Sequence, residues 1–212
     1  MTDKRLELSP NIVAAYLHKH PENFTKADIA GFVHSYGIKM VNFMYPAEDG
    51  RIKTLNFIIN SLEYLETILS QGERVDGSSL FPSFVEAGSS DLYVIPRFRT
   101  AFVDPFAEIP TLDLLCSFYD KDGRTFECDP YQTVRKAAYE FTKSTGMTFD
   151  AMGELEYYVI ADEEDLFPGS DQKGYHESGP FAKLNNFRTE CMSLIAQTGG
   201  QIKYGHSEVG NF

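Results

Sequence analysis

The stretch 38-IKMVNFMYPAEDGRIKTLNFII-59 contains two predicted strands on which the rest of the fold is built. Residues 38–46 and 51–59 are rich in Ile, Val, Phe and Tyr, which is typical of β-strands. The four residues between them, 47-AEDG-50, have the composition of a hairpin turn. We therefore expect an antiparallel β-hairpin at this position.

Helices are predicted on both sides of the hairpin. In the segment 25-TKADIAGFVHSYG-37, Thr25 and Asp28 have the spacing of a capping box, and a glycine ends the pattern. The segment 61-SLEYLETILSQG-72 begins with a capping serine and repeats Leu and Ile at helical spacing. Strand-like runs follow at 91–96 and 100–106. This order predicts a small α+β unit, with one sheet covered by helices.

The second half of the chain carries longer segments. Its predicted elements are a strand over 111–120, a helix from Asp129-Pro130 to about residue 144, a strand over 149–160, a helix over 183–197 and a strand over 201–209.

The composition excludes several classes of protein. The chain has 212 residues and a formal net charge of −12, which disfavours binding to nucleic acid or to an anionic membrane through bulk electrostatics. Its three cysteines show no metal-binding spacing, which favours reduced thiols. A secretory signal and an apolar run of membrane-spanning length are both absent from the sequence. We expect a cytoplasmic protein.

Two glutamates lie in the predicted strand 153-GELEYYVIAD-162. Alternate residues of a strand face the same side at roughly 6.5–7 Å, so Glu154 and Glu156 project together. By the same rule His206 and Glu208 share a face of the last strand. Carboxylates gathered on adjoining strands repel each other unless divalent cations such as Mg²⁺ or Mn²⁺ lie between them. Solvent on a surface strand, or an arginine partner, would also satisfy the two glutamates.

Five short segments fall in the order that one enzyme family shows. They are 75-VDGSSLFPSF-84, 100-TAFVDPF-106, 153-GELEYY-158, Lys173-Gly174-Tyr175 and 206-HSEV-209. Together they resemble the N-terminal half of a glutamine synthetase, from about residue 36 to the end of the chain. One departure is Ser207, where the family has a second histidine.

The resemblance implies an α+β fold with three parts. A helical extension over 1–30 precedes a β-grasp domain over 31–107. Residues 108–212 would form the first part of the family's catalytic β-sheet/α domain, which starts with the strand over 111–119 and is truncated here. The 212-residue chain by itself is therefore expected to be inactive.

The resemblance also implies roles for single residues. Glu154, Glu156 and Glu208 would bind two or three Mg²⁺ or Mn²⁺ ions. Asp76 and Ser79 would lie on a loop that enters the active site of a neighbouring subunit, where Asp76 binds ammonium and takes up its proton.

Two aromatic residues complete the implied site. Tyr175 would line the ammonium pocket together with Glu208, and His206 would lie close to nucleotide and substrate. Purely structural explanations exist as well: Asp76 and Ser79 can stabilise a turn, and Tyr175 and His206 can simply pack.

The implied activity is ATP-dependent ligation of ammonia to the side-chain carboxylate of glutamate, through a γ-glutamyl phosphate. The implied partners are glutamate, ammonium and ATP, with further copies of the chain in a homo-oligomer whose subunits share active sites. The alternatives are a ligase that joins glutamate to another amine, and a non-catalytic relative that serves assembly or regulation.

Overall fold

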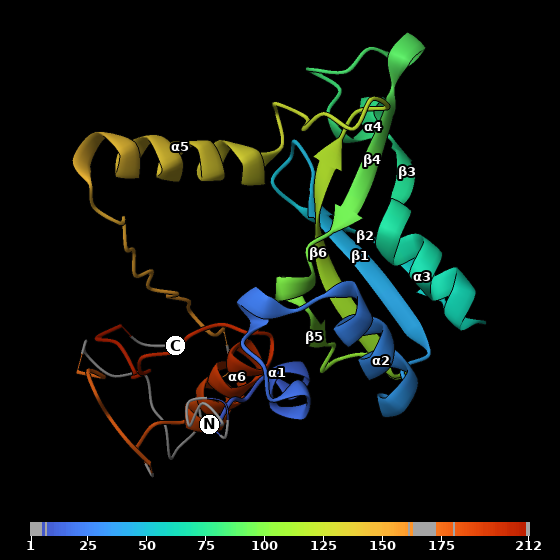
Figure 1. Ribbon diagram of the computed structural model, residues 1–212. Helices are drawn as coiled ribbons and strands as arrows, with labels where there is room; N and C mark the ends of the chain where they lie inside the picture. The colour runs from blue at the N-terminus through green and yellow to red at the C-terminus, as the bar shows by residue number, and fades with distance from the viewer. Residues whose placement is uncertain (1–5, 7, 161, 163–172, 180, 211–212) are drawn as a thin grey trace. The chain divides into compact units, whose positions relative to one another are not determined.

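The computed structural model describes residues 6, 8–160, 162, 173–179 and 181–210 (Figure 1). It divides into two compact units, Met1–Phe149 and Asp150–Phe212, and each is described by itself. The fold is mixed α+β, as the sequence predicts. Within the described residues, no helix combines the length and the apolar character that crossing a membrane requires.

A six-stranded sheet forms the first unit. Its order is β2 (Ile52–Ile58), β1 (Met40–Pro46), β6 (Thr111–Tyr119), β4 (Asp91–Pro96) and β3 (Glu73–Asp76), and β5 (Phe102–Val103) also pairs with β6. The antiparallel pair β1–β2 is the predicted hairpin. Strand β6 runs parallel to β1 and antiparallel to β4 and β5. It is therefore the strand that joins both halves of the sheet.

The helices include one close to each of the four ranges predicted above, 25–37, 61–72, 129–144 and 183–197. They are α1 (Ile12–Leu17), α2 (Lys26–Tyr36), α3 (Leu62–Gln71), α4 (Gly77–Leu80), α5 (Pro130–Thr145) and α6 (Asn185–Gln197), with short 3₁₀ turns η1 (Pro21–Asn23), η2 (Ala87–Ser89) and η3 (Phe98–Thr100). Ser61 caps α3 and Asp129 caps α5, and each side chain accepts a hydrogen bond from the first turn of its helix.

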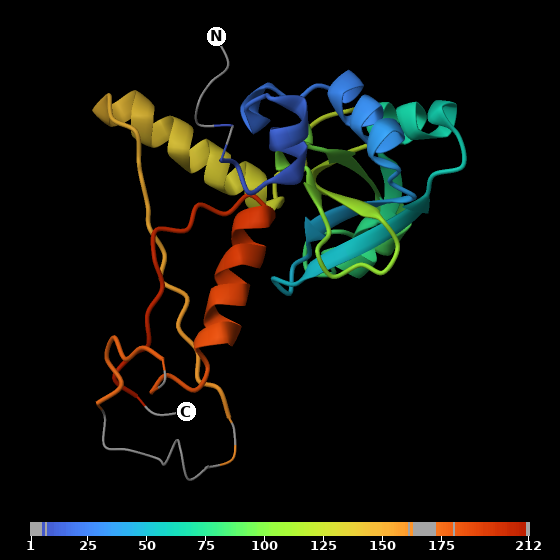
Figure 2. The same cartoon turned by 90° about the horizontal axis from the view of Figure 1, so that it is seen from below.

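The hydrophobic core lies between one face of the sheet and helices α2 and α3, which Figure 2 shows on the same side of the strands. Alternate residues of β6 point into it, and all of them are fully buried: Leu112, Leu114, Cys116 and Phe118. The helices contribute Ile29, Phe32, Leu65 and Leu69. Each buried side chain of this size stabilises the fold by about 1.5–3 kcal/mol, so this layer holds the unit together.

A row of polar side chains crosses the opposite face of the sheet. Asn56, Asn42 and Asp113 are register partners on β2, β1 and β6. Asn56 donates a hydrogen bond to Asn42 at 2.7 Å, and Asn42 donates one to the Asp113 carboxylate at 2.8 Å. Asp113 is only 3% exposed. Burial raises the pKa of Asp113 to about 6, and the hydrogen bond from Asn42 only partly opposes the rise.

Helix α3 ends where the chain passes close to the sheet. Gly72 has a φ of +67°, and a Cβ at this position would lie 2.1 Å from the carbonyl oxygen of Val94. Only glycine adopts this conformation without strain and leaves room for the strand. Gly72 is therefore needed both to end α3 and to let the chain pass close to Val94 of β4.

The strand over 111–119 differs from its expected place. The sequence assigned it to the start of the next domain, whereas β6 pairs with β1, β4 and β5 in the centre of the first sheet. Its continuous apolar pattern reflects burial within this sheet, which a sequence pattern cannot distinguish from burial in another. The outer limits of the three predicted domains remain predictions.

Two shorter segments also depart from expectation. The strand predicted over 100–106 is reduced to the two residues of β5, and residues 73–76, for which no strand was predicted, form β3. In the N-terminal part, the Asn11 side chain caps α1 and donates to the Ala101 carbonyl at 3.1 Å. Val13 is fully buried, so α1 belongs to the core of the first unit.

The second unit contains α6 and extended chain. The strands predicted over 149–160 and 201–209 are wrong, because neither range forms a ladder in the described residues. The side chains expected to be buried are exposed, with Met152 at 75% and Ile160 at 97%. A strand requires a neighbour to pair its backbone groups, and the described part of this unit provides none.

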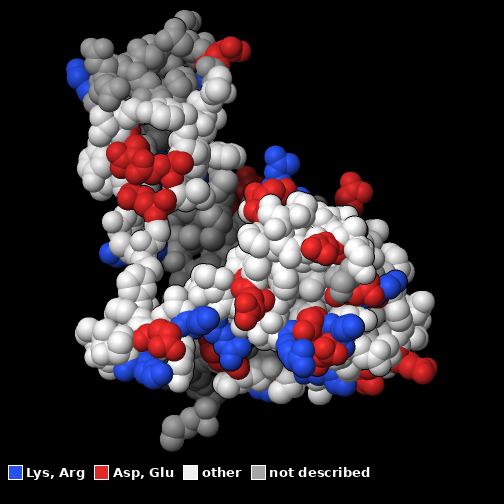
Figure 3. Space-filling model, turned by 90° about the horizontal axis from the view of Figure 1, so that it is seen from above, with Lys and Arg blue, Asp and Glu red and all other residues white. Residues whose placement is uncertain are grey.

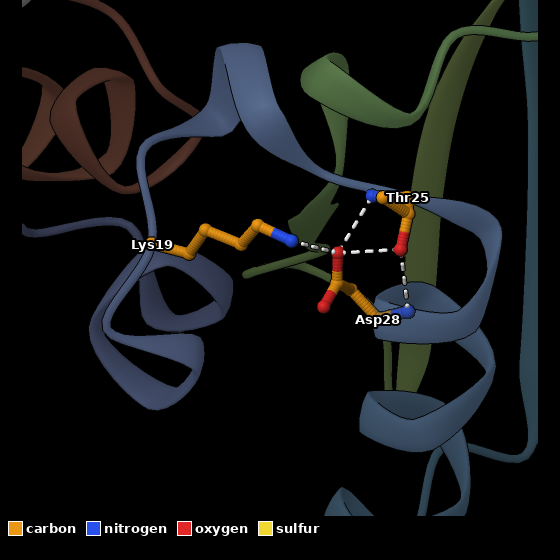
Figure 4. Close-up of polar contacts among 3 residues, drawn as sticks. All are labelled: Lys19, Thr25 and Asp28. Atoms are coloured by element: carbon orange, nitrogen blue, oxygen red, sulfur yellow. Dashed lines mark hydrogen bonds and ion pairs between the residues drawn. The ribbon is translucent and has the colours of Figure 1, made fainter.

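Helix α2 begins with the capping box that the sequence predicts (Figure 4). The Thr25 side chain accepts from the Asp28 backbone N–H at 3.2 Å, and the Asp28 carboxylate accepts from the Thr25 backbone N–H at 2.7 Å. Lys19 adds a bond to Asp28 at 2.6 Å. Burial opposes ionisation, but the bonds from Lys19 and Thr25 outweigh it and lower the pKa of Asp28.

Replacing Thr25 with alanine is expected to lower the free energy of unfolding by about 1 kcal/mol, because an N–H of the first turn loses its acceptor. Urea unfolding followed by circular dichroism measures the loss. Thr67→Ala is the matched control, since the Thr67 hydroxyl only bonds back to the Glu63 carbonyl within α3. Equal effects of the two substitutions would contradict the capping role.

Replacing Asp113 with asparagine is expected to stabilise the protein at neutral pH. The folded-state pKa is raised, so between about pH 4 and pH 6 the unfolded chain loses its proton while the folded protein keeps it. Stability therefore falls as pH rises through this window, by about 3 kcal/mol in all, since each pKa unit corresponds to about 1.4 kcal/mol. The amide introduced by Asp113→Asn would keep an acceptor for Asn42 and remove this cost.

The measurement is the free energy of unfolding of both proteins from pH 3.5 to pH 8. We expect the free energy of unfolding of the variant to rise relative to that of the wild type between about pH 4 and pH 6. Above pH 6 the difference should stay constant. Asp122→Asn, in an exposed turn, is the control. A difference that does not change with pH would contradict a buried, protonated Asp113.

Candidate functional site

Asp76 is the last residue of β3, and Ser79 lies in α4, the one-turn helix that follows directly. Asp76 caps α4, and its Oδ1 accepts from the backbone N–H and the hydroxyl of Ser78 at 3.0 and 2.7 Å. The Ser79 hydroxyl donates to Oδ2 at 2.6 Å. The Gly77 N–H donates to the Ser90 carbonyl at 2.6 Å, which ties the turn to the chain before β4.

These hydrogen bonds stabilise the ionised form of Asp76. The hydroxyls of Ser79 and Ser78, in that order, lower the pKa of its carboxyl to about 2. At neutral pH the group is therefore a permanent anion and a weak base. Such a group is well suited to hold a cation, and it accepts a proton only with difficulty.

In the second unit, Glu154, His206 and Glu208 converge. One ligand atom from each lies within 4.8 Å of the other two. The His206 Nδ1 is 3.4 Å from a Glu208 carboxylate oxygen, and the side chains of these two residues are 18% and 45% exposed. Figure 3 shows acidic side chains gathered on this smaller unit, whereas acidic and basic side chains are interspersed over the larger one.

The donor set fits a divalent cation. Metal–ligand distances of about 2.0–2.6 Å place two ligands of one ion at most about 5 Å apart, and the three side chains meet this limit. Two carboxylates and an imidazole suit several divalent metals. Glu154, Glu208 and His206 are therefore the residues that would hold a metal ion here.

Glu156 is not part of this cluster. Both Glu154 and Glu156 are exposed, and the segment that carries them is not a strand, so the predicted strand face that the two would share is wrong. The rule that alternate residues share a face applies only to a paired strand. Metal binding by Glu156 remains a prediction.

Hydrogen bonds between two distant segments hold the second unit's site together. The Ser207 hydroxyl donates to the carbonyls of Gly174 and Glu177 at 2.8 and 3.0 Å, and the His176 N–H donates to the Ser207 carbonyl at 3.0 Å. A Cβ on Gly174 would lie 2.6 Å from the Glu208 carbonyl oxygen, so the close approach requires glycine. We call this set of contacts the Ser207 clamp.

The clamp brings four rings together. Tyr175 stacks on His176 with ring centroids 4.2 Å apart, and His176 lies 4.4 Å from His206. Tyr175 and Tyr204 lie 5.3 and 5.8 Å from His206. Tyr175 therefore lies close to the segment that carries Glu208, and its role in an ammonium pocket stays a prediction.

Sequence reasoning missed the roles of His176 and Ser207. In the sequence, Ser207 stands out only as a departure from a histidine pair, and His176 is one histidine next to Tyr175. Neither residue has a local pattern that marks it, because both act through contacts across about thirty positions of sequence. Asp76 and Ser79 belong to the other unit.

A comparison with family models and known proteins agrees with the fold. Residues 37–121 match the model for the β-grasp domain of glutamine synthetase. The glutamine synthetase of Methanococcus voltae is 25% identical over 185 residues, covering 84% of this chain and 41% of the relative. That of Clostridium saccharobutylicum is 27% identical over 191 residues, covering 88% and 42%. The chain spans about two fifths of the length of these relatives.

Solved structures show the same fold. The cryoEM structure of Plasmodium falciparum glutamine synthetase has a TM-score of 0.65 at 15% identity, covering 89% of this chain and 43% of that one. Ligand-free GmaS has a TM-score of 0.60 at 11% identity, covering 82% and 40%. The resemblance drawn from the five sequence segments is thereby confirmed.

Replacing Ser79 with alanine is expected to raise the pKa of Asp76 from about 2 towards its ordinary value, because the strongest stabilising hydrogen bond is removed. Carboxyl ¹³C chemical shifts followed from pH 1.5 to pH 6 measure it. Ser83→Ala is the control, an exposed serine in the segment that follows. An unchanged pKa in the Ser79 variant would show that this hydrogen bond does not form in solution.

Proposed function

With a β-grasp domain of the glutamine synthetase type in residues 37–121, we propose that the protein is an ATP-dependent ligase that joins ammonia to the side-chain carboxylate of glutamate. The observation that carries the proposal is the convergence of Glu154, His206 and Glu208 in a chain with this domain. Two or three divalent cations, Mg²⁺ or Mn²⁺, would offset the negative charge that develops when a phosphoryl group moves from ATP to glutamate.

The proposed reaction has two steps. The glutamate side-chain carboxylate attacks the terminal phosphorus of ATP, which forms a γ-glutamyl phosphate and releases ADP. Ammonium first gives one proton to solvent, and the resulting ammonia attacks the acyl carbon. The bond between the acyl carbon and the phosphate oxygen then breaks, and the departing phosphate takes up the proton that the new amide nitrogen loses. Glu154 and Glu208 would hold the metal, with Glu156 as a further proposed ligand.

The low pKa of Asp76 favours one of its two implied roles, binding ammonium, over the other, accepting the proton of ammonium. Its carboxylate has a pKa of about 2, so it would attract ammonium as a cation while remaining a poor proton acceptor. We therefore assign Asp76 the binding of ammonium, with Ser79 keeping it ionised. Tyr175 would line the ammonium pocket next to His206, and further copies of the chain would complete the active site by contributing the Asp76 turn.

The test is an assay, in the full-length protein that contains these residues, for ADP release that depends on glutamate and on an amine. Glu154→Gln is expected to reduce kcat/KM by more than the roughly 10–100-fold that loss of an outer-shell metal partner costs, because a metal ligand is removed. The exposed Glu190 of α6 gives the matched control, Glu190→Gln.

Each result has a definite reading. Activity with ammonium that Glu154→Gln abolishes supports the proposal. Activity only with alkylamines would replace it with a ligase for another amine. No glutamate-dependent ADP release with any amine would overturn the ligase assignment and leave a non-catalytic relative.

A further inference from the structure

The Asp76 turn, residues 76–80, ends next to a buried anchor. Phe81 follows the turn directly and is 1% exposed. Its ring packs edge-on against Phe118 and Phe126, with the ring centroids 5.0 Å apart in each pair. The hydrophobic core therefore fixes the end of the turn, whereas the Asp76 carboxylate at its start is exposed and needs support of another kind.

Glu48 links this turn to the β1–β2 hairpin. The Glu48 backbone N–H donates to the Leu80 carbonyl at 3.0 Å, and the Glu48 Oε2 accepts from the Ser83 backbone N–H at 3.0 Å. Leu80 and Ser83 lie on either side of Phe81 in the sequence, so the two bonds hold both ends of one short segment. The side-chain bond spans 35 positions of sequence, and no local pattern marks Glu48 for this role.

Side-chain packing between the hairpin and the turn is incomplete. A surface hollow of about 290 Å³ lies there, lined by Asp49 and Lys53 of the hairpin and by Ser79 and Leu80 of the turn, among others. A hydrogen bond from a backbone N–H to a carboxylate is stronger than one between neutral groups. Where packing is sparse, such a bond contributes more to the position of the turn.

We propose that Glu48 is a positioning residue for ammonium binding, because its carboxylate holds the Asp76 turn in the geometry that presents Asp76 to the cation. The inference rests on the proposed function and adds a residue to it. Since α4 is a single helical turn, a shift at Leu80 is passed on to Ser79, whose hydroxyl donates to the Asp76 carboxylate at 2.6 Å. The candidate metal ligands belong to the other unit, so the effect should be confined to ammonium.

The test compares three substitutions in the full-length protein that contains these residues. Glu48→Ala removes the acceptor, whereas Glu48→Gln removes the charge and keeps an amide oxygen that can accept the Ser83 N–H. Asp49→Ala is the matched control, because the bonds that Asp49 accepts, from the Arg51 N–H and from Lys53, stay within the hairpin. Both substituted side chains are exposed, so the fold should survive.

Two measurements are made on each protein. One is steady-state kinetics, with ammonium, glutamate and ATP varied in turn. The other is hydrogen exchange of the backbone amides of α4 at neutral pH, which needs no activity.

In Glu48→Ala we expect the KM for ammonium to rise by about fivefold, which is the factor that one hydrogen bond typically contributes. The kcat at saturating ammonium and the KM values for glutamate and ATP should stay within about twofold, because only ammonium binding is weakened. The Ser78 and Phe81 amides should exchange faster. Glu48→Gln and Asp49→Ala should match the wild type in both measurements.

Three results would overturn the proposal. The first is an unchanged KM for ammonium in an active Glu48→Ala variant, even with faster exchange, because Glu48 would then be merely structural. The second is an equal rise in KM for Glu48→Ala and Glu48→Gln, because the charge of Glu48 would then act on ammonium directly. The third is an equal effect of Asp49→Ala, because any disturbance of the hairpin would then suffice.

The outcome is separable from that of the proposed function. Faster exchange in α4 of Glu48→Ala but not of Glu48→Gln, in a protein without ligase activity, would keep Glu48 as the anchor of the Asp76 turn and remove the ligase assignment. Ligase activity with the same KM for ammonium in all four proteins would do the reverse.

Discussion

The pairing of β6 with strands on both of its edges is the constraint on which the first unit depends. Its parallel ladder with β1 requires the chain to leave the β1–β2 hairpin, cross over through α3 and return, because parallel neighbours cannot be joined by a short turn. Side chains of the same strand also contribute to both faces of the sheet. Leu112 and Leu114 face the helices, and Asp113 between them joins the polar row with Asn42.

The carboxylates of this chain show how environment sets chemistry. Asp113 is buried with one hydrogen-bond donor, and its pKa rises to about 6. Asp76 receives two serine hydroxyls in an exposed turn, and its pKa falls to about 2. Glu154 and Glu208 lie close together next to an imidazole, where a cation is the natural compensation. Three arrangements therefore give a carboxyl that stays protonated to unusually high pH, a fixed anion and a pair of candidate metal ligands.

The Ser207 clamp joins two segments of the second unit that are distant in the sequence, as β6 joins the two halves of the sheet in the first unit. It joins the 174–177 segment to the 206–209 segment without a β-ladder, and it brings His176, His206 and Glu208 into one place. Its hydrogen bonds connect Ser207 with Gly174, His176 and Glu177, three neighbouring residues of the other segment.

The sequence by itself determined the local elements and the resemblance. The Thr25–Asp28 box, the hairpin around 47–50 and the Asp129 cap all formed as predicted, because each depends on residues within a few positions. It also found Glu154, His206 and Glu208 as candidates. Only the tertiary structure decided that 111–119 belongs to the first sheet, that 149–160 is not a strand, and that His176 lies beside His206. Those three outcomes depend on which distant segment lies next to each residue, and periodicity along one strand carries no information about its neighbours.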